Sequence, residues 1–121
     1  MDGEPIVEKS VNSGFIGTNL EKMLRDQKIQ TLYICGITTD HCVSTTTRTA
    51  NNLHVCDVLS EDGSVSAGRI VLVEDATACF QKPDGKWDAE TVHGVNVESL
   101  KEFAHIQTTD EVVGDLTAET T

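Results

Sequence analysis

The stretch TLYICGITTDHCVSTTTRTA, residues 31 to 50, decides the fold of this chain. Residues 31 to 36 form a nearly continuous apolar run ended by a glycine, which is typical of a strand buried on both faces of a parallel sheet. After a polar turn, residues 41 to 53 carry apolar and small side chains at helical spacing, although threonines are weak helix formers that need tertiary packing. The stretch therefore predicts a central strand, a polar turn and a packed helix.

Strands and helices alternate on both sides of this stretch. A short strand is predicted at 5 to 9, and Thr18 with Glu21 is predicted to form a capping box that starts the next helix. Further along, we predict strands at 53 to 55, 69 to 76 and 105 to 108, a loop or a hairpin at 56 to 68, and a long helix capped by Asp88 at 89 to 104. This alternation predicts an α/β fold built on a doubly wound parallel sheet, a Rossmann-like three-layer sandwich.

The composition fits one domain and excludes several classes of partner. The chain has 121 residues, with 9 basic and 20 acidic side chains and a net charge of -11. Such a charge repels phosphate backbones and anionic lipids, so we expect no binding to nucleic acid or to a membrane. Since no apolar run approaches the roughly 20 residues of a membrane span and the first residues do not resemble a signal peptide, a cytoplasmic protein is expected.

Four cysteines are too few for a secreted disulfide scaffold, and we expect them to be free thiols. Cys35 and Cys42 are seven residues apart, and His41 and His54 do not complete the paired short spacings of a zinc site. We therefore expect neither a metal nor another cofactor.

Cys42 is the candidate nucleophile. If Asp40 caps the helix, Cys42 lies in its first turn, where free N–H groups and the positive end of the helix dipole favour a thiolate. The alternative is a small, buried, inert cysteine. Lys9 also follows a predicted strand and could reach the same crevice, although a lone lysine at a strand end is more often solvated.

Four segments together resemble a known family. VEKSVNSGFIGTNLEKML, LYICGITTDHCVSTTTRTANNL, VLVEDATACF and WDAETVHGVNVESLKEFA are similar, in this order, to the second half of the isochorismatase-like cysteine hydrolases. The resemblance implies hydrolysis of a small amide or a related carbon–nitrogen bond. It implies that Cys42 is the nucleophile and that Lys9 is the second catalytic residue.

The resemblance also gives the polar turn a role. It implies a cis peptide bond between Ile37 and Thr38, which would aim the backbone N–H of Thr38, beside that of Cys42, at a developing oxyanion.

Candidate substrate contacts are Phe15, Thr39 and His41. Thr39, Asp40 and His41 either touch substrate or cap the helix, and capping is the favoured interpretation.

The sequence departs from the family in two places. The family's catalytic aspartate lies on the first strand, in a segment of apolar residues followed by D-x-Q, and no segment here matches it, which implies an N-terminally truncated domain over 1 to 113. The acidic, threonine-rich end of the sequence predicts a flexible tail over 114 to 121. Asp75 could stand in for this aspartate, although a structural role is favoured. Residues 56 to 68 interrupt the family pattern, either as a true insertion or as an artefact of gene prediction.

Two functions are left open. The first is a cysteine hydrolase acting on a small-molecule substrate. The second is a truncated, catalytically silent fragment that serves as a binding or oligomer-interface module. A sheet without its first strands would expose an edge and apolar surface, so a homo-oligomer is expected in both cases.

Overall fold

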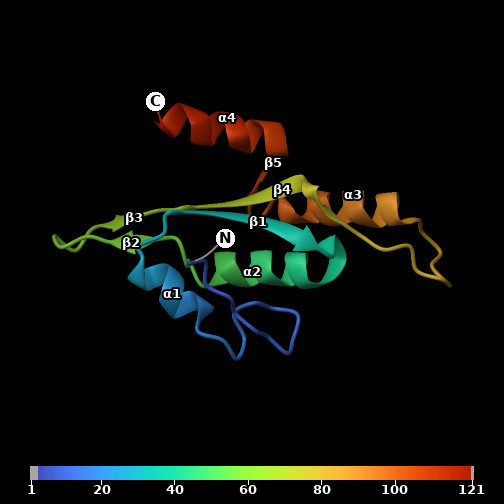
Figure 1. Ribbon diagram of the computed structural model, residues 1–121, viewed down its shortest axis with the longest axis horizontal. Coiled ribbons are helices and arrows are strands. Elements are labelled where there is room, and N and C mark those ends of the chain that lie inside the picture. Colours follow the sequence, from blue (N-terminus) through green and yellow to red (C-terminus); the bar gives the residue numbers. More distant parts are fainter. Residues whose placement is uncertain (1–2, 121) are drawn as a thin grey trace.

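The computed structural model describes residues 3–120, which form a three-layer α/β arrangement (Figure 1). The strands are β1 (Thr31–Ile37), β2 (Val58–Leu59), β3 (Val65–Ser66), β4 (Arg69–Ala78) and β5 (His105–Gln107). The helices are α1 (Leu20–Asp26), the π-helical turn η1 (Thr39–Val43), α2 (Ser44–Asn52), α3 (Ala89–Leu100) and α4 (Thr109–Thr120). Among the described helices, none is long and apolar enough to cross a bilayer.

The central layer is a parallel sheet with the order β1-β4-β5. Side chains alternate along β4: Ile70 and Leu72 join the larger core with α2 and α3, whereas Val71 and Val73 face Val112 of α4. Helices therefore cover both faces of the sheet (Figure 1), which confirms the predicted fold class.

The position of β1 in this sheet differs from the prediction. β4 is the central strand of the described sheet, and β1 lies at its edge. Only Ile34 of β1 is buried, and Cys35 is exposed. The register shifts between Ile34 and Gly36, and the positive φ of Gly36, +126°, is a conformation that side chains other than glycine rarely adopt. An apolar run at an edge was thus mistaken for a doubly buried strand.

Two predicted strands are not formed. Residues 5 to 9 are irregular and pair with no strand of the described residues, and Ile6 is 89% exposed. Residues 53 to 55 form a turn at the end of α2, where the N–H of Val55 bonds to the carbonyl of Ala50. These backbone groups complete the helix end and are not available to a sheet.

The helix starts gave one wrong and one confirmed prediction. The predicted capping box is not formed, because Asn19 is the residue at the N-cap position and Glu21 accepts from Arg25. The Thr18 hydroxyl donates to the Gly14 carbonyl at 2.5 Å and accepts from the Leu20 N–H at 3.3 Å. Asp88, in contrast, caps α3 by accepting from the Thr91 N–H at 2.7 Å. That helix ends at Leu100 and not at residue 104.

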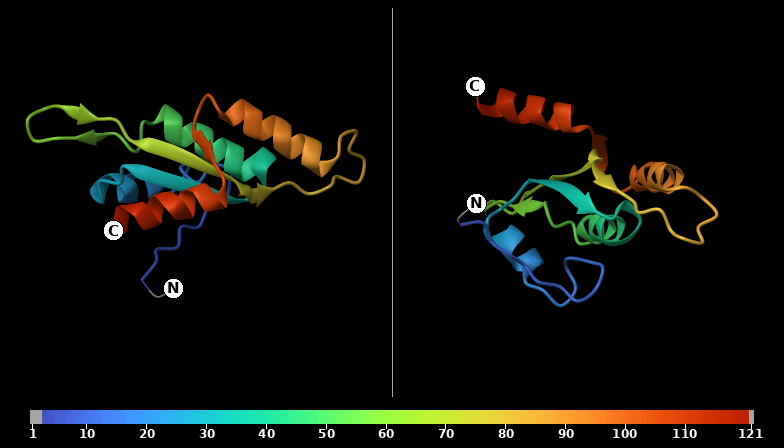
Figure 2. Two further views of the ribbon diagram at one scale, coloured as in Figure 1. Left: turned by 90° about the horizontal axis from the view of Figure 1, so that it is seen from above. Right: turned by 45° about the vertical axis from the view of Figure 1, so that its right-hand side comes forward.

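Residues 56 to 68 form the hairpin that was one of the two predicted alternatives. β2 and β3 pair antiparallel, and the hairpin projects away from the body of the sheet (Figure 2). At its base, Gly68 packs directly against the backbone of Cys56. The hairpin is therefore joined closely to the core although its tip is not.

Residues 114–120, which the sequence predicted to be part of a tail, continue helix α4. The helix begins with a capping box, in which the Glu111 carboxylate accepts from the Thr108 N–H and the Thr108 hydroxyl accepts from the Glu111 N–H. Val112 is buried against the sheet. Capping and this one apolar contact explain why a polar segment is helical.

Candidate active site at the carboxyl end of the sheet

Cys42 and Lys9 meet at the carboxyl end of β1, although 33 residues separate them. The Lys9 Nζ donates to the Cys42 Sγ at 3.2 Å and to the Val11 carbonyl at 2.9 Å. Cys42 is half-buried and lies in the η1 turn, and Lys9 is exposed. An ammonium group beside a thiol favours the thiolate, so the contact is chemically suited to a nucleophile.

The turn that holds Cys42 begins at Thr39, two residues earlier than a cap at Asp40 would place it. The Ile37–Thr38 peptide bond is cis, and Thr38 is the capping residue that precedes the turn. The Thr38 carbonyl accepts from the N–H groups of His41 and Val43. Capping by Asp40 is therefore wrong, but Cys42 still lies in the first turn of a continuous helical segment that runs through α2.

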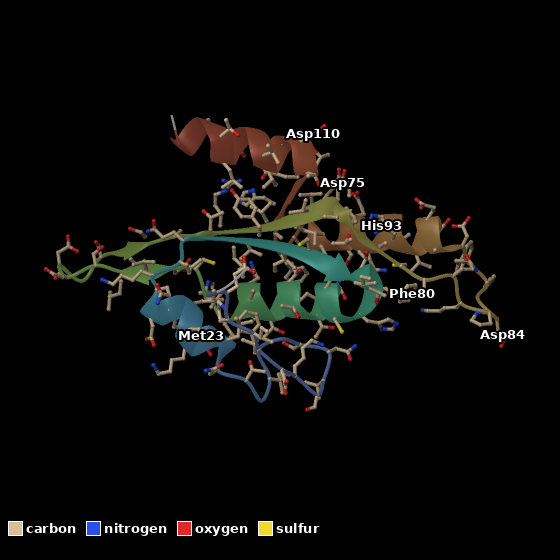
Figure 3. All side chains as sticks on the ribbon, viewed as in Figure 1. Met23, Asp75, Phe80, Asp84, His93 and Asp110 are labelled. Carbon is tan, nitrogen blue, oxygen red and sulfur yellow. The ribbon has the colours of Figure 1, made fainter. Side chains whose placement is uncertain are left out.

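Thr39 connects this turn to α3. Its side chain is fully buried, and its Oγ1 lies 2.8 Å from the Nδ1 of His93. Thr39 thus neither caps the helix nor presents its hydroxyl to solvent. His93 lies near the end of β4 with Asp75 and Phe80 (Figure 3). Sequence analysis missed His93, although its position four residues before buried Val97 indicated the inward face of α3.

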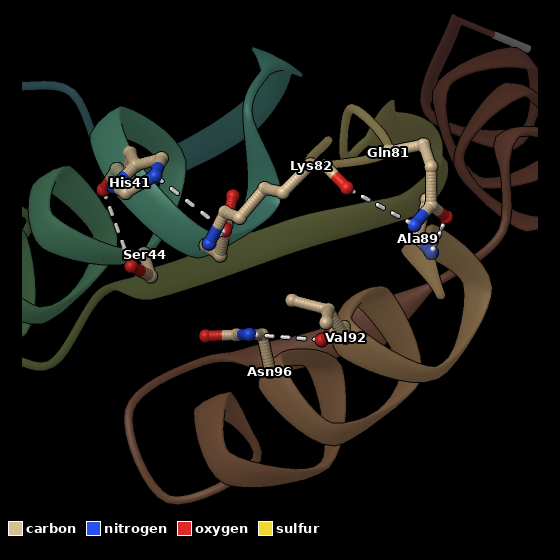
Figure 4. Close-up of polar contacts among 8 residues, drawn as sticks. His41, Ser44, Gln81, Lys82, Ala89, Val92 and Asn96 are labelled. Atoms are coloured by element: carbon tan, nitrogen blue, oxygen red, sulfur yellow. Dashed lines mark hydrogen bonds and ion pairs between the residues drawn. The ribbon is translucent and has the colours of Figure 1, made fainter. Parts of the chain in front are cut away.

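Asp40 is a second polar centre of the same turn. Its side chain is only 10% exposed and its carboxylate lies 3.1 Å from the Lys82 Nζ and 3.5 Å from the His41 Nε2. Burial raises the pKa of Asp40, but hydrogen bonding from Lys82, Thr38 and Cys79 outweighs it and leaves the pKa below its usual value. Lys82 was not predicted from the sequence, and Figure 4 shows it reaching toward the turn that carries His41.

Phe15 is partly buried and packs against the larger hydrophobic core. Its loop is seated on α2 by threonines: the Gly14 N–H donates to the Thr46 hydroxyl at 3.0 Å, and Ser13 donates to Thr49 at 3.1 Å. The polar threonine run thus holds the segment that leads back to Lys9.

Within residues 3–120, no carboxylate lies within ion-pair distance of Lys9. Asp75 accepts from the hydroxyl and the N–H of Thr109, and these two bonds hold the pKa of Asp75 below its usual value. Asp75 therefore stabilises the start of α4.

The described residues contain no group of three or more His, Cys, Asp or Glu placed to hold a metal ion.

A cavity of about 350 Å³ lies at the opposite, amino end of the strands. It is lined by residues that include His54, Cys56, Gly68 and His105, and neither Cys42 nor Lys9 contributes to it. The reactive groups and this hollow are therefore separate features.

The family model and the related proteins both place this chain in the isochorismatase family. The pattern of the Isochorismatase domain matches residues 1–111. The chain is 44% identical over 119 residues to the uncharacterized isochorismatase family protein YrdC of Bacillus subtilis, covering 95% of this chain and 57% of that protein. It is 36% identical over 66 residues to the ureidoacrylate amidohydrolase RutB of Azorhizobium caulinodans, covering 54% of this chain and 29% of that protein.

Among solved structures, a cysteine hydrolase from Pseudomonas syringae pv. phaseolicola superimposes with a TM-score of 0.81 at 25% identity, covering 98% of this chain and 51% of that chain. The chain thus spans little more than half the length of the curated relative that it matches over most of its own length.

Proposed function

We propose, from the premise that this chain belongs to the isochorismatase family of hydrolases, that it acts on a small amide or a related carbon–nitrogen bond with Cys42 as nucleophile. The observation that carries this proposal is the 3.2 Å contact between the Lys9 Nζ and the Cys42 Sγ. The names of two relatives, an amidohydrolase and a cysteine hydrolase, support the same chemistry.

The proposed reaction is acyl transfer to sulfur. The Cys42 thiolate attacks the substrate carbonyl, and the backbone N–H groups of Thr38 and Cys42 hold the oxyanion that forms. The carbon–nitrogen bond breaks as the leaving nitrogen takes a proton, which leaves a thioester on Cys42. Water then cleaves the thioester and releases the acid. His41, whose side chain is exposed, and Phe15 are the proposed substrate contacts. Thr39, the third residue expected from the sequence, is fully buried with its Oγ1 on His93 and is assigned a structural role instead.

Lys9 would stabilise the thiolate, and the proton for the leaving group would come from a carboxylate, as the family resemblance implies. No carboxylate of the described residues pairs with Lys9. Since losing one member of a catalytic unit typically lowers turnover by about 10⁴, we expect the 121-residue chain to be a weak catalyst alone. Adding a segment with the family's aspartate should restore turnover.

The experiment compares the purified chain with Cys42→Ala and Cys35→Ala on a panel of small amides, with release of ammonia or amine as the readout. Cys35 is the matched control because it is an exposed cysteine on the adjoining strand. The proposal expects a slow rate that Cys42→Ala abolishes and Cys35→Ala leaves unchanged. A rate that survives Cys42→Ala would contradict it.

The second candidate function is a catalytically silent binding or oligomer-interface module, with the family domain at 1–113. It is favoured by the unpaired edge of β1 and by exposed apolar side chains at that end, among them Ile37 and Phe80. For either function we propose a cytoplasmic homo-oligomer. Sedimentation at micromolar concentration tests the assembly, and a sharp monomer with cooperative unfolding would count against it.

A further inference from the structure

The loop between β4 and α3 passes beside the cysteine turn at the carboxyl end of the sheet (Figure 1). All of residues 80–88 are exposed, including the aromatic side chains of Phe80 and Trp87. Gln81 ties the loop to α3, since its Oε1 accepts from the Ala89 N–H at 3.0 Å (Figure 4). Its connection to the cysteine turn is made by Lys82.

The Lys82–Asp40 contact joins an exposed side chain to one that is largely shielded from solvent. Lys82 is 57% exposed and Asp40 only 10%, with 3.1 Å between the Nζ and the carboxylate. Within residues 3–120, it is the only ion pair between this loop and the turn. If the loop moved away, a shielded carboxylate two residues before Cys42 would lose its cationic partner, which is unfavourable for a group with so little access to water.

We propose that Asp40 and Lys82 form a latch that holds loop 80–88 against the cysteine turn, so that Asp40 is a positioning residue for Cys42. The assignment of Cys42 rests on the proposed function, but the latch itself does not. Asp40 acts through the loop and through its charge, and it touches no reacting atom. Its other partners are His41 and Thr38, which belong to the turn itself, and Cys79, which precedes the loop at the end of β4, so within residues 80–88 only Lys82 bonds to it.

Limited proteolysis tests the mechanical part of the proposal. Trypsin can cut after Lys86 when the loop opens, whereas the Lys82–Pro83 bond resists trypsin, so Lys82→Gln removes no cleavable site. We expect Lys82→Gln and Asp40→Asn each to speed cleavage after Lys86 about fivefold, and the double variant to be no faster than either. Glu98→Gln is the matched control, because it breaks the exposed Lys101–Glu98 pair on α3 and should cleave at the parental rate.

Cys42 alkylation by iodoacetamide at pH 7.5 tests the positioning part. Lys82→Gln leaves the Asp40 charge uncompensated and should slow alkylation about threefold, whereas Asp40→Asn removes the charge and should accelerate it by a similar factor. Parental cleavage and alkylation rates in Lys82→Gln would overturn the proposal. This variant decides the matter if Asp40→Asn fails to fold, since the Lys82 side chain is largely exposed. Neither readout needs amide turnover, so failure of the proposed hydrolysis is a separate result.

Discussion

The two ends of the parallel sheet differ in what they bring together. At the carboxyl end, reactive or polar groups from distant segments are within bonding distance, as Lys9 is of Cys42 and Lys82 of Asp40. At the amino end there is a cavity of about 350 Å³, bordered by the base of the hairpin. The hollow arises where the hairpin leaves the sheet, whereas the reactive contacts arise where strands end at a helix start. Cavities of similar size, about 360 and 290 Å³, lie beside His93 at the carboxyl end, so the contacts between side chains, and not the cavity volumes, distinguish the two ends.

Thiol reactivity should separate the two ends most strongly. Cys42 lies at the carboxyl end beside Lys9, while Cys56 at the amino end is 2% exposed, and burial, followed by the nearby Asp57 charge, raises the pKa of its thiol. With limiting iodoacetamide, we expect Cys42 to be labelled about a thousandfold faster than Cys56. Peptide mass spectrometry measures both. Labelling of Cys35, Cys56 or Cys79 before Cys42 in the folded chain would remove the basis for the nucleophile.

A substitution at the amino end should cost stability. A Cβ on Gly68 would lie 2.1 Å from the Cys56 carbonyl oxygen, so Gly68→Ala forces the backbone apart and should destabilise the fold by about 3 kcal/mol. Gly94→Ala is the control: a Cβ there meets nothing within 4 Å, and alanine in a helix should stabilise by up to about 1 kcal/mol. Urea unfolding measures both. Equal stabilities would show that the hairpin base is not part of the cooperative core.

Removing the lysine at the carboxyl end should change reactivity without changing stability. Lys9→Met deletes the ammonium group 3.2 Å from the Cys42 Sγ and should slow Cys42 alkylation at neutral pH about tenfold. Lys22→Met, which breaks an exposed ion pair on α1, is the control and should leave the rate as it is. The two variants should unfold at the same urea concentration, and a slower rate in both would point to a general charge effect.

We expect the smallest effect on Cys42 reactivity and on stability from a substitution of Asp75, an acidic residue at the carboxyl end that stabilises the start of α4. Asp75→Asn should weaken amide protection in the first turn of α4 and leave Cys42 alkylation unchanged. Because Thr109 lowers the pKa of Asp75 in the folded state, this contribution is present above about pH 4 and is lost as the pH falls through the lowered value. Hydrogen exchange at neutral and acid pH measures it, and a loss of Cys42 reactivity would mean that Asp75 takes part in the site.

Local signals in the sequence predicted individual helices and strands well, but they predicted poorly which strands pair with one another. The Asp88 cap and the apolar run of β4 act within a few residues, and both are formed. An apolar run such as residues 31 to 36 can form either an edge strand or a central strand, so its composition did not predict that β1 would lie at the edge of the sheet. Residues 5 to 9 had a strand-like pattern, but a strand also requires a neighbour, which the pattern does not encode.

The site follows the same rule. Cys42 and Lys9 were chosen from their places after predicted strands and from the family resemblance, and the structure brings their side chains together. His93 and Lys82 were missed because each acquires its meaning from a contact made by packing α3 and its preceding loop against the cysteine turn. A histidine on a helix and a lysine in a loop carry no such information by themselves.

The threonines of α2 make it difficult to raise the stability of this helix and to keep the Lys9–Cys42 contact at the same time. Replacing Thr46 and Thr49 with alanine would improve intrinsic helix propensity by a few tenths of a kcal/mol each. It would also cut the bonds that seat Gly14 and Ser13, and with them the segment that carries Lys9 to Cys42. A variant selected only for heat resistance at these positions would therefore tend to lose the ammonium–sulfur contact, so thermostabilisation of this helix should be screened by thiol reactivity as well as by melting temperature.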